Sequence, residues 1–178
     1  MLPPLVERAL ALSERLGFER SCSVETGRLL QVLAGQRGRS RVAEIGTGCG
    51  VGAAWILSAL SPETAFVTVE LDDERAAATA ELLAADEQAR VLHGDWRDVL
   101  PPEAPFDLLF ADGGRSKEHE GLVGLLTPGG TLVLDDLTPR RFGPDPVREL
   151  WLGHPRFAAV ELQVSPHEAA IVAALQPR

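Results

Sequence analysis

Short apolar runs alternate with longer helical patterns from residue 41 onward. Each run is rich in Val, Leu, Ile or Phe and is bounded by Gly, Pro or Asp, which is typical of β-α-β units that build a parallel sheet. The chain should therefore fold as an α/β protein. The predicted strands cover residues 41–45, 65–70, 90–93, 106–111 and 131–135, and the predicted helices between them cover residues 50–60, 73–85 and 116–126.

The C-terminal part breaks this alternation. A helix around residues 145–152 is followed by two strand-like runs, 157–164 and 168–175, with only Ser165-Pro166-His167 between them. So short a connection cannot be a parallel crossover. We therefore expect an antiparallel hairpin at the edge of the parallel sheet.

Two helical patterns, residues 5–16 and 24–34, precede the first strand, and each is followed by a glycine that can end a helix. A chain of 178 residues with 45% hydrophobic residues can build one sizeable core. We predict a single domain over residues 1–178, with N-terminal helices in 1–40 and an α/β core in 41–178. The predicted core is doubly wound, with a mostly parallel seven-stranded sheet.

Charge and composition restrict the partners. A net charge of −9 argues against general affinity for nucleic acid, and no run approaches the roughly 20 apolar residues of a membrane span. Arg37, Arg39 and Arg41 cluster before the first strand, where we expect a solvated turn. Cys22 and Cys49 lack the spacing of a metal site or redox pair. These features predict a cytoplasmic protein without a nucleic-acid or membrane partner.

Acidic residues end or follow each strand of the predicted parallel sheet. Ligands of open parallel sheets bind outside the carboxyl ends of the strands. Each acid alone could be a helix cap or a solvated loop residue, but their repetition along one edge suits a cationic ligand or a metal. The acids are Glu44, Glu70, Asp95, Asp112, Asp135 and Asp136.

A glycine-rich loop follows the first predicted strand, with glycines at 46, 48, 50 and 52. Such a loop can turn tightly, and the helix after it offers free backbone amides to a ligand. Residues 48–53 also match the dinucleotide-binding fingerprint, and Glu70 lies about 20 residues further on, where an acid would bind ribose hydroxyls. The loop alone therefore leaves a nicotinamide cofactor open as an alternative.

Several motifs together resemble one enzyme class. Residues 43–50, Ala-Glu-Ile-Gly-Thr-Gly-Cys-Gly, resemble motif I of the class I S-adenosylmethionine (SAM)-dependent methyltransferases, and residues 69–72 resemble their motif at the end of the second strand. Segments 93–96, 106–112 and 126–136 follow in the order and spacing of that class. The upstream segment 23–30 is similar to the small O-methyltransferases of the catechol and caffeoyl-CoA type. The resemblance covers residues 41–136 well and the remainder loosely.

This resemblance implies a Rossmann-like fold and a role for each motif. Glu44 and the glycine loop would hold the methionine part of SAM, Glu70 the ribose hydroxyls, and Asp95 with Trp96 would lie beside the adenine. For Trp96 and Asp95, core packing and a loop cap are the alternative roles. The expected cofactor-binding residues are Glu44, Gly46, Thr47, Gly48, Gly50, Glu70, Leu71, Gly94, Asp95, Trp96 and Asp112.

The same resemblance raises the question of a metal. Catechol-type relatives hold Mg²⁺ with an Asp after the fourth strand and an Asp-Asn pair after the fifth, positions that are here Asp112, Asp135 and Asp136. Bound Mg²⁺ would lower the pKa of the acceptor hydroxyl. Two departures count against it: Asp136 replaces the Asn, and Arg115 stands where the family often has a catalytic Lys. Arginine stays protonated, so it could pair with an anionic substrate but not act as a base.

The expected reaction is methyl transfer from SAM to a small-molecule acceptor, at a hydroxyl oxygen, with Asp112, Arg115 and His119 as candidate catalytic residues. His119 is a candidate base, with an exposed helix histidine as the alternative. The loop at 137–146, with Arg140 and Arg141, is a candidate substrate-binding segment. Relatives suggest a homodimer.

Two other functions stay open at this stage. One is an NAD-dependent oxidoreductase, which is disfavoured because the chain contains no tyrosine and predicts no second domain. The other is a SAM-binding protein without catalysis.

Overall fold

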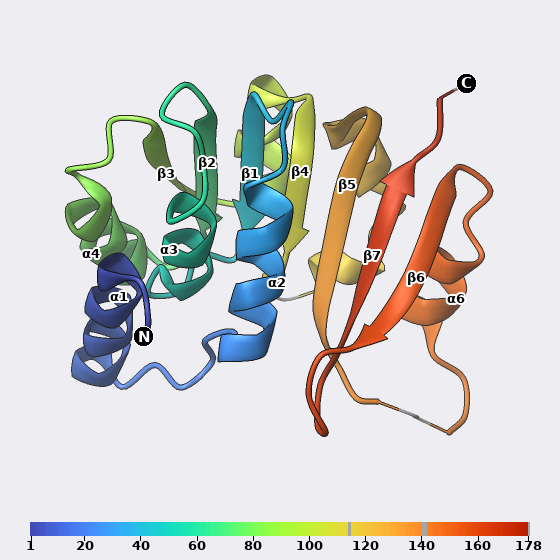
Figure 1. The fold of residues 1–178 in the computed structure, drawn as a ribbon, viewed down its shortest axis with the longest axis horizontal. Helices are drawn as coiled ribbons and strands as arrows, with labels where there is room; N and C mark the ends of the chain where they lie inside the picture. The colour runs from blue at the N-terminus through green and yellow to red at the C-terminus, as the bar shows by residue number, and fades with distance from the viewer. Residues whose placement is uncertain (114, 140–141, 178) are drawn as a thin grey trace.

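The computed structural model describes residues 1–113, 115–139 and 142–177. Over these residues, seven strands form one sheet in the order β3-β2-β1-β4-β5-β7-β6 (Figure 1). The strands are β1 (Arg41–Ile45), β2 (Ala65–Glu70), β3 (Ala89–His93), β4 (Phe106–Ala111), β5 (Leu126–Leu137), β6 (Phe157–Gln163) and β7 (Ala169–Leu175). The first five are parallel, and β7 pairs antiparallel with both β5 and β6. The predicted fold class and the terminal hairpin are confirmed.

The helices lie on both faces of this sheet, as a doubly wound fold requires. The α-helices are α1 (Pro4–Leu16), α2 (Val24–Ala34), α3 (Val51–Leu57), α4 (Asp73–Leu83), α5 (Trp96–Val99) and α6 (Pro146–Leu152). The described residues also form three short 3₁₀ helices: η1 (Pro101–Glu103), η2 (Ser116–Glu118) and η3 (Glu120–Leu125). In Figure 1, α1 to α4 lie in front of the sheet and α6 behind it.

Alternation along the strands divides the core between these two faces. Val42, Leu108 and Phe110 pack with residues of α2 and α3, whereas Ala43 and Leu109 pack with residues of η3 and α6 on the opposite face. Successive side chains of a strand point to opposite faces, so a central strand covered on both sides reads as a continuous apolar run. This is why the sequence located the central strands well.

The N-terminal helices pack against α3 rather than against the sheet alone. Val6 and Ala9 of α1 share a core cluster with Trp55 of α3. A Cβ at Gly27 of α2 would lie 2.2 Å from the Trp55 ring, so a glycine is needed for this close crossing. Gly17 ends α1 in the left-handed conformation (φ 62°), as predicted.

One predicted helix is wrong. Residues 116–126 form η2 and η3 instead of an α-helix, and β5 already begins at Leu126. The indole Nε1 of Trp151 donates to the Lys117 carbonyl at 2.6 Å, and His119 has an extended conformation (φ −104°, ψ 111°). Both features interrupt α-helical hydrogen bonding through this segment.

Arg39 also differs from the prediction of a solvated turn. Its guanidinium donates to the carbonyl of Leu33, to Thr131 Oγ1 and to the carbonyl of Asp107, so it fastens the end of α2 to β4 and β5. Burial lowers the pKa of Arg39, partly offset by the charge of Asp107. Arg37, by contrast, is exposed.

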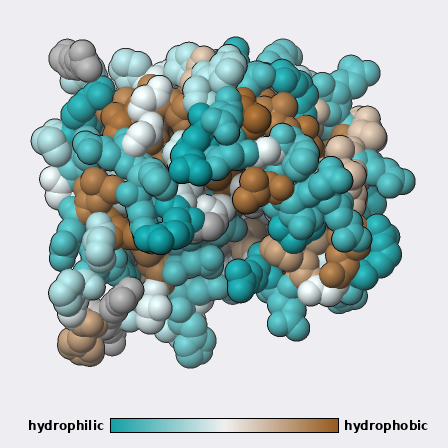
Figure 2. All heavy atoms as spheres, turned by 180° about the vertical axis from the view of Figure 1, so that it is seen from behind, coloured by the Kyte–Doolittle hydropathy of each residue, from teal (hydrophilic) through white to brown (hydrophobic). Residues whose placement is uncertain are grey.

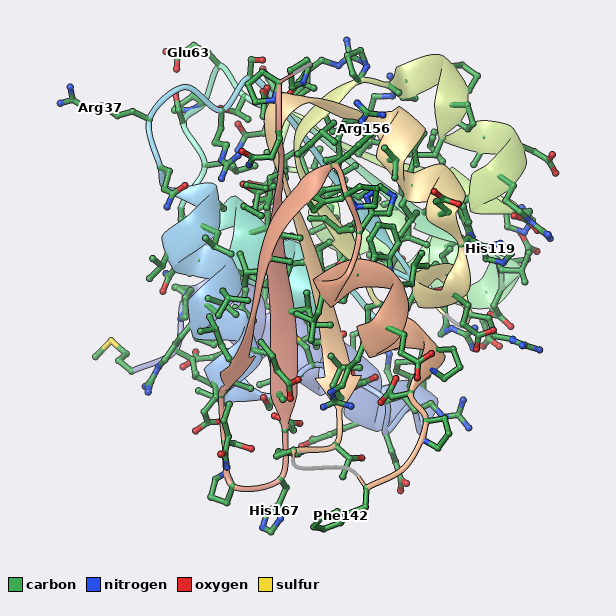
Figure 3. The ribbon with its side chains drawn as sticks, turned by 90° about the vertical axis from the view of Figure 1, so that its right-hand side faces the viewer. Arg37, Glu63, His119, Phe142, Arg156 and His167 are labelled. Atoms are coloured by element: carbon green, nitrogen blue, oxygen red, sulfur yellow. The ribbon has the colours of Figure 1, made fainter. Side chains whose placement is uncertain are left out.

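The two ends of the sheet carry different surfaces. Arg37 and Glu63 project at one end, and His167 and Phe142 project at the other (Figure 3). On the face opposite to that of Figure 1, apolar residues are scattered among polar ones (Figure 2). Among the described residues, no helix is long and apolar enough to cross a membrane.

Candidate active site

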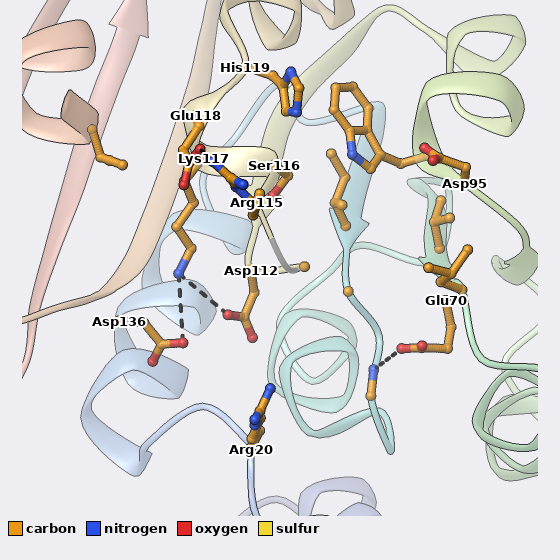
Figure 4. A pocket seen from close by; sticks show the side chains of 18 of the residues that line it. Arg20, Glu70, Asp95, Asp112, Arg115, Ser116, Lys117, Glu118, His119 and Asp136 are labelled. Carbon is orange, nitrogen blue, oxygen red and sulfur yellow. Dashed lines mark hydrogen bonds and ion pairs between the residues drawn. The ribbon is translucent and has the colours of Figure 1, made fainter.

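A cavity of about 820 Å³ opens along the carboxyl ends of the parallel strands (Figure 4). Most of the predicted site residues line it: Gly46, Gly48, Glu70, Leu71, Gly94, Asp95, Trp96, Asp112, Arg115, His119 and Asp136. Glu44 and Thr47 line a smaller recess that shares Gly46 and Asp112 with the main cavity. Gly50 lies outside both and caps α3 with φ 82°. Asp135 is buried behind the wall.

Two glycines let the loops after β1 and β4 pass in contact. A Cβ on Gly46 would lie 2.3 Å from Gly113 Cα, and Gly46 has φ 93°. The backbone amides of Asp112 and Gly113 both donate to the carbonyl of Ile45, at 2.9 and 2.6 Å. This close approach brings Asp112 beside the glycine loop.

Glu44 is a fully buried carboxyl at the end of β1. Thr68 Oγ1 donates to its Oε2 at 2.5 Å, and the Thr47 hydroxyl lies 2.5 Å from that of Thr68. A Cβ on Gly52 would lie 2.2 Å from Glu44 Oε1, so the glycine at 52 makes room for the carboxyl. Burial raises the pKa of Glu44 to about 8 despite the Thr68 hydrogen bond. A cation bound beside this carboxyl would lower its pKa again.

Glu70 ties the end of β2 to the glycine loop. Its Oε2 accepts the backbone N–H of Gly48 at 2.8 Å, and its Oε1 accepts from the backbone N–H of Asp72 and from the Arg75 guanidinium, each at 2.9 Å. Arg75 in turn stacks over the ring of Phe18, 5.0 Å from its centroid. The carboxylate therefore organises the loop as well as facing the cavity.

The far end of the cavity has apolar walls. Leu71 is 70% exposed and borders the cavity, and Trp96 lies edge-on to His119 with ring centroids 5.8 Å apart. Asp95 is the N-cap of α5 and pairs with Arg97 at 2.5 Å. Hydrogen bonds from Arg97 lower the pKa of Asp95 to about 2. Asp95 is thus a cap, as the alternative held, while it also borders the cavity.

Ser116 was missed by sequence reasoning. It is 1% exposed and lines the cavity, yet its hydroxyl has no hydrogen-bond partner among the described residues. A buried unpaired hydroxyl is costly, so such a group beside a cavity points to a ligand partner. The only signal in the sequence was its position shortly after Asp112.

Three carboxylates converge at the other end of the cavity. Oxygen atoms of Asp112, Asp135 and Asp136 lie within 4.8 Å of one another, so the structure brings the three acids together. Asp136 is held at φ 55°, at a bulge where β5 shifts its register against β7. This left-handed conformation is uncommon for a residue other than glycine, although Asn and Asp tolerate it best.

A lysine that sequence reasoning missed lies among these carboxylates. Lys117 Nζ donates to the Asp135 carbonyl at 2.7 Å and to Asp135 Oδ1 at 3.1 Å, and lies 3.6 Å from Asp112 and 3.7 Å from Asp136 (Figure 4). Burial lowers the pKa of Lys117, but the negative charges of Asp135, Asp112 and Asp136 outweigh this and raise it above its usual value. Lys117 is therefore an ammonium ion.

The carboxyl groups respond to the same burial. Burial and the charge of Asp135 raise the pKa of Asp112, against the opposing charge of Lys117. Burial likewise raises the pKa of Asp135. Two neighbouring, largely buried carboxyls resist carrying two negative charges at once.

Arg115 and His119 border the cavity away from this cluster. The Arg115 side chain is 82% exposed and pairs with Glu118 at 2.6 Å. His119 is exposed at the junction of η2 and η3, beside Trp96. Lys117, not Arg115, reaches the carboxylates. The catalytic roles of Arg115 and His119 remain predictions.

The donor set suits Mg²⁺ by chemistry, because carboxylate oxygens are its preferred ligands. The arrangement of these residues does not suit the ion, because the Lys117 ammonium already contacts the carboxylate oxygens that would bind it. At a separation of about 4 Å, the repulsion between an ammonium and a divalent cation is on the order of 2 kcal/mol even at the dielectric constant of water. The residues as arranged do not form a divalent metal site.

Comparisons with known proteins agree with this architecture. Residues 43–137 match a family described as a methyltransferase domain. A predicted O-methyltransferase of Mycobacteroides abscessus is 34% identical over 117 residues, 61% of this chain and 54% of that protein. A protein-L-isoaspartate O-methyltransferase of Methanopyrus kandleri is 33% identical over 115 residues, 63% of this chain and 48% of that protein. The chain spans about half the length of these curated relatives.

Solved structures resemble it over nearly its whole length. The O-methyltransferase TomG of Streptomyces achromogenes, crystallised with SAM, superimposes with a TM-score of 0.83 at 24% identity, covering 99% of this chain and 92% of TomG. At this level of identity the similarity concerns the fold.

Proposed function

This chain belongs to the methyltransferase-domain family, and on that premise we propose that it transfers the methyl group of SAM to a hydroxyl oxygen of a small-molecule acceptor. The observation that carries the proposal is one continuous cavity. It runs from the glycine loop, past Glu70 and Trp96, to the carboxylate of Asp112. A cavity of about 820 Å³ has room for a cofactor and a small acceptor together.

The walls of the cavity support a specific orientation for SAM. Glu44 would receive the methionine ammonium, because its buried carboxyl gains most from a cationic partner. Glu70 would bind the ribose hydroxyls with the acceptor capacity that Gly48 and Arg75 leave free. Leu71 and Trp96 would hold the adenine between apolar surfaces, and the Ser116 hydroxyl is a further candidate contact in the same cavity.

Family membership favours SAM over a nicotinamide cofactor, which the glycine loop alone left open. Glu44 supports the same choice. Its carboxyl suits the ammonium of methionine, whereas the part of a dinucleotide that a glycine loop binds is its negatively charged pyrophosphate. The other alternative is a protein that binds SAM without catalysis, and an activity assay distinguishes it from an enzyme.

The transfer requires alignment and removal of one proton. The sulfonium of SAM carries a reactive methyl group, so the protein must hold the acceptor oxygen in line with it and exclude water. We assign proton removal to Asp112 in its carboxylate form, because it borders the cavity where the loops after β1 and β4 meet and because its raised pKa makes that carboxylate a stronger base. His119 is the second candidate base, and Arg115 is a candidate contact for a polar acceptor.

Arg20 supports an acceptor or cofactor group with negative charge. It lines both the cavity and the recess beside Asp112, and it makes no ion pair with any described residue (Figure 4). An unpaired guanidinium at such a position suits a carboxylate or phosphate. The predicted contribution of Arg140 and Arg141 lies outside the described residues.

We further propose a cytoplasmic homodimer that acts on small molecules and not on nucleic acid. The two free cysteines fit a reducing compartment, and the net charge of −9 disfavours phosphate backbones. The homodimer rests on the resemblance to the catechol type alone.

Two measurements test the proposal. Calorimetry with SAM and with NAD should give binding of SAM only, and binding of NAD alone would remove the proposed reaction. A tritium-transfer assay from methyl-labelled SAM to a panel of phenols then tests catalysis. We expect Asp112→Asn to slow transfer by roughly 100-fold or more while SAM affinity changes less than about threefold.

The matched control is Asp73→Asn, an exposed aspartate in the first turn of α4, which should leave the rate unchanged. Wild-type rates in Asp112→Asn would show that Asp112 is not the base. SAM binding without transfer to any phenol would favour the non-catalytic alternative.

A further inference from the structure

The carboxylate cluster contains a cation supplied by the chain itself. The ammonium of Lys117 touches all three acids that the family resemblance assigns to a metal, and its side chain is only 11% exposed. Two of its three hydrogens point to Asp135, one to the carbonyl and one to the carboxylate. Asp112 Oδ1 and Asp136 Oδ2 lie a little further from Nζ, at 3.6 and 3.7 Å.

The backbone that carries Lys117 is fixed from the opposite side. Trp151 of α6 is fully buried, and its indole N–H donates to the Lys117 carbonyl at 2.6 Å. The Trp151 ring packs edge-on against Phe157 of β6 and stacks on His154. His154 Nε2 lies 3.2 Å from Glu120 Oε1, which secures the segment after Lys117 as well. Lys117 thus enters the cluster from a rigid support.

A divalent ion and this ammonium would compete for the same oxygens. Asp135 Oδ1 and Asp112 Oδ1 are the carboxylate oxygens nearest to Nζ, and a metal bound by the cluster would need oxygens of the same residues. A metal would have to expel the ammonium from a buried site where it has four oxygen neighbours. Expulsion would break these contacts of a largely buried charge, which is costly.

We propose that Lys117 is the resident cation of this site, in place of a divalent metal. The positive charge that faces the acceptor oxygen then comes from the chain, and Lys117 also positions Asp112 beside the glycine loop. The second part, that methyl transfer needs no metal ion, rests on the function proposed above. The first part, that Lys117 occupies the carboxylates, does not depend on the proposed function.

Binding of Mn²⁺ tests the occupancy directly, without any acceptor or cofactor. The signal of free Mn²⁺ in electron paramagnetic resonance falls when the ion binds, so titration of the full chain gives an affinity. Wild-type protein should bind Mn²⁺ no better than millimolar. Lys117→Met, which keeps the length of the side chain and removes its charge, should bind at least about 30-fold more tightly. Mg²⁺ should compete for the new site.

Two further variants assign the new site to the cluster. Adding Asp135→Asn to Lys117→Met should abolish the gain in Mn²⁺ affinity, whereas Lys117→Arg should stay as weak as wild type because it keeps the charge. Circular dichroism and SAM calorimetry monitor the fold of each variant. Tight binding of Mn²⁺ by the wild-type protein, at micromolar concentration, would overturn the proposal even if no variant folds.

The metal-independence of transfer has its own readout. With a phenol that accepts the methyl group, the wild-type rate should be the same in EDTA and in Mg²⁺. A rate that EDTA abolishes and Mg²⁺ restores would overturn this part. If no SAM binds at all, the proposed function fails, while the Mn²⁺ titration still decides the role of Lys117.

Discussion

Glu70 Oε2 accepts the backbone N–H of Gly48 at 2.8 Å, so the end of β2 holds the loop that follows β1. The same carboxylate accepts from Arg75, and its side chain is almost fully buried. A role in cofactor binding is therefore inseparable from a role in shaping the loop. Replacing Glu70 should affect both stability and SAM affinity.

We expect Glu70→Ala to lower the free energy of unfolding by about 2–4 kcal/mol, because it leaves a buried N–H and a guanidinium without their acceptor. SAM affinity should fall at least tenfold. Urea denaturation and calorimetry measure the two effects, with the exposed Glu74→Ala on α4 as the control. Unchanged SAM affinity in Glu70→Ala would remove Glu70 from the cofactor site.

Gly52→Ala should destabilise the protein although alanine favours helix over glycine by about 1 kcal/mol. The new Cβ would lie 2.2 Å from Glu44 Oε1, so the buried carboxyl or the start of α3 must move. We expect a lower melting temperature and weaker SAM binding. Gly121→Ala in η3 is the matched control, because its Cβ would have no neighbour within 4 Å. Equal melting temperatures for the two variants would contradict the steric argument.

The pKa of Glu44 predicts how stability depends on pH. Burial raises it to about 8 in the folded protein, from about 4.5 in the unfolded chain. Between these values the folded state binds the extra proton, so stability falls as pH rises. Over this window the loss attributable to Glu44 is on the order of 5 kcal/mol.

Glu44→Gln removes that proton equilibrium. The difference in unfolding free energy between this variant and wild type should therefore grow in favour of the variant from pH 4.5 to pH 8. Urea titrations at several pH values measure it, with Glu87→Gln at an exposed position as the control. A difference that stays constant with pH would show that the Glu44 pKa is not raised.

Ser116→Ala should separate stability from cofactor binding. The hydroxyl has no partner among the described residues, so its removal should leave the unfolding free energy unchanged or slightly higher. If the hydroxyl contacts bound SAM, affinity should fall about fivefold to tenfold, as expected for one hydrogen bond. Calorimetry with SAM and thermal unfolding test the two parts. A stability loss above about 1 kcal/mol would show that the hydroxyl has an internal partner.

The sequence by itself determined the sheet and the acids at the carboxyl ends of its strands. Buried strands such as β1 and β4 are short apolar runs with sharp ends, and the residue at each end, such as Glu44 or Glu70, is fixed once the strand is known. The spacing of apolar residues and the Gly, Pro or Asp residues that end each run are local properties. They can be identified without knowing which distant residue each one contacts.

Tertiary structure alone decided the other end of the cavity. Lys117 lies in a segment whose composition predicts an α-helix, and only the indole of Trp151, 34 residues further on, holds that segment in another conformation. Arg39 likewise resembles a solvated turn residue until Thr131, 92 residues away, accepts its hydrogen bond. Contacts of this kind depend on which distant elements pack together, and hydrophobic periodicity does not predict that. The carboxylates could thus be grouped from the sequence, but the cation among them could not.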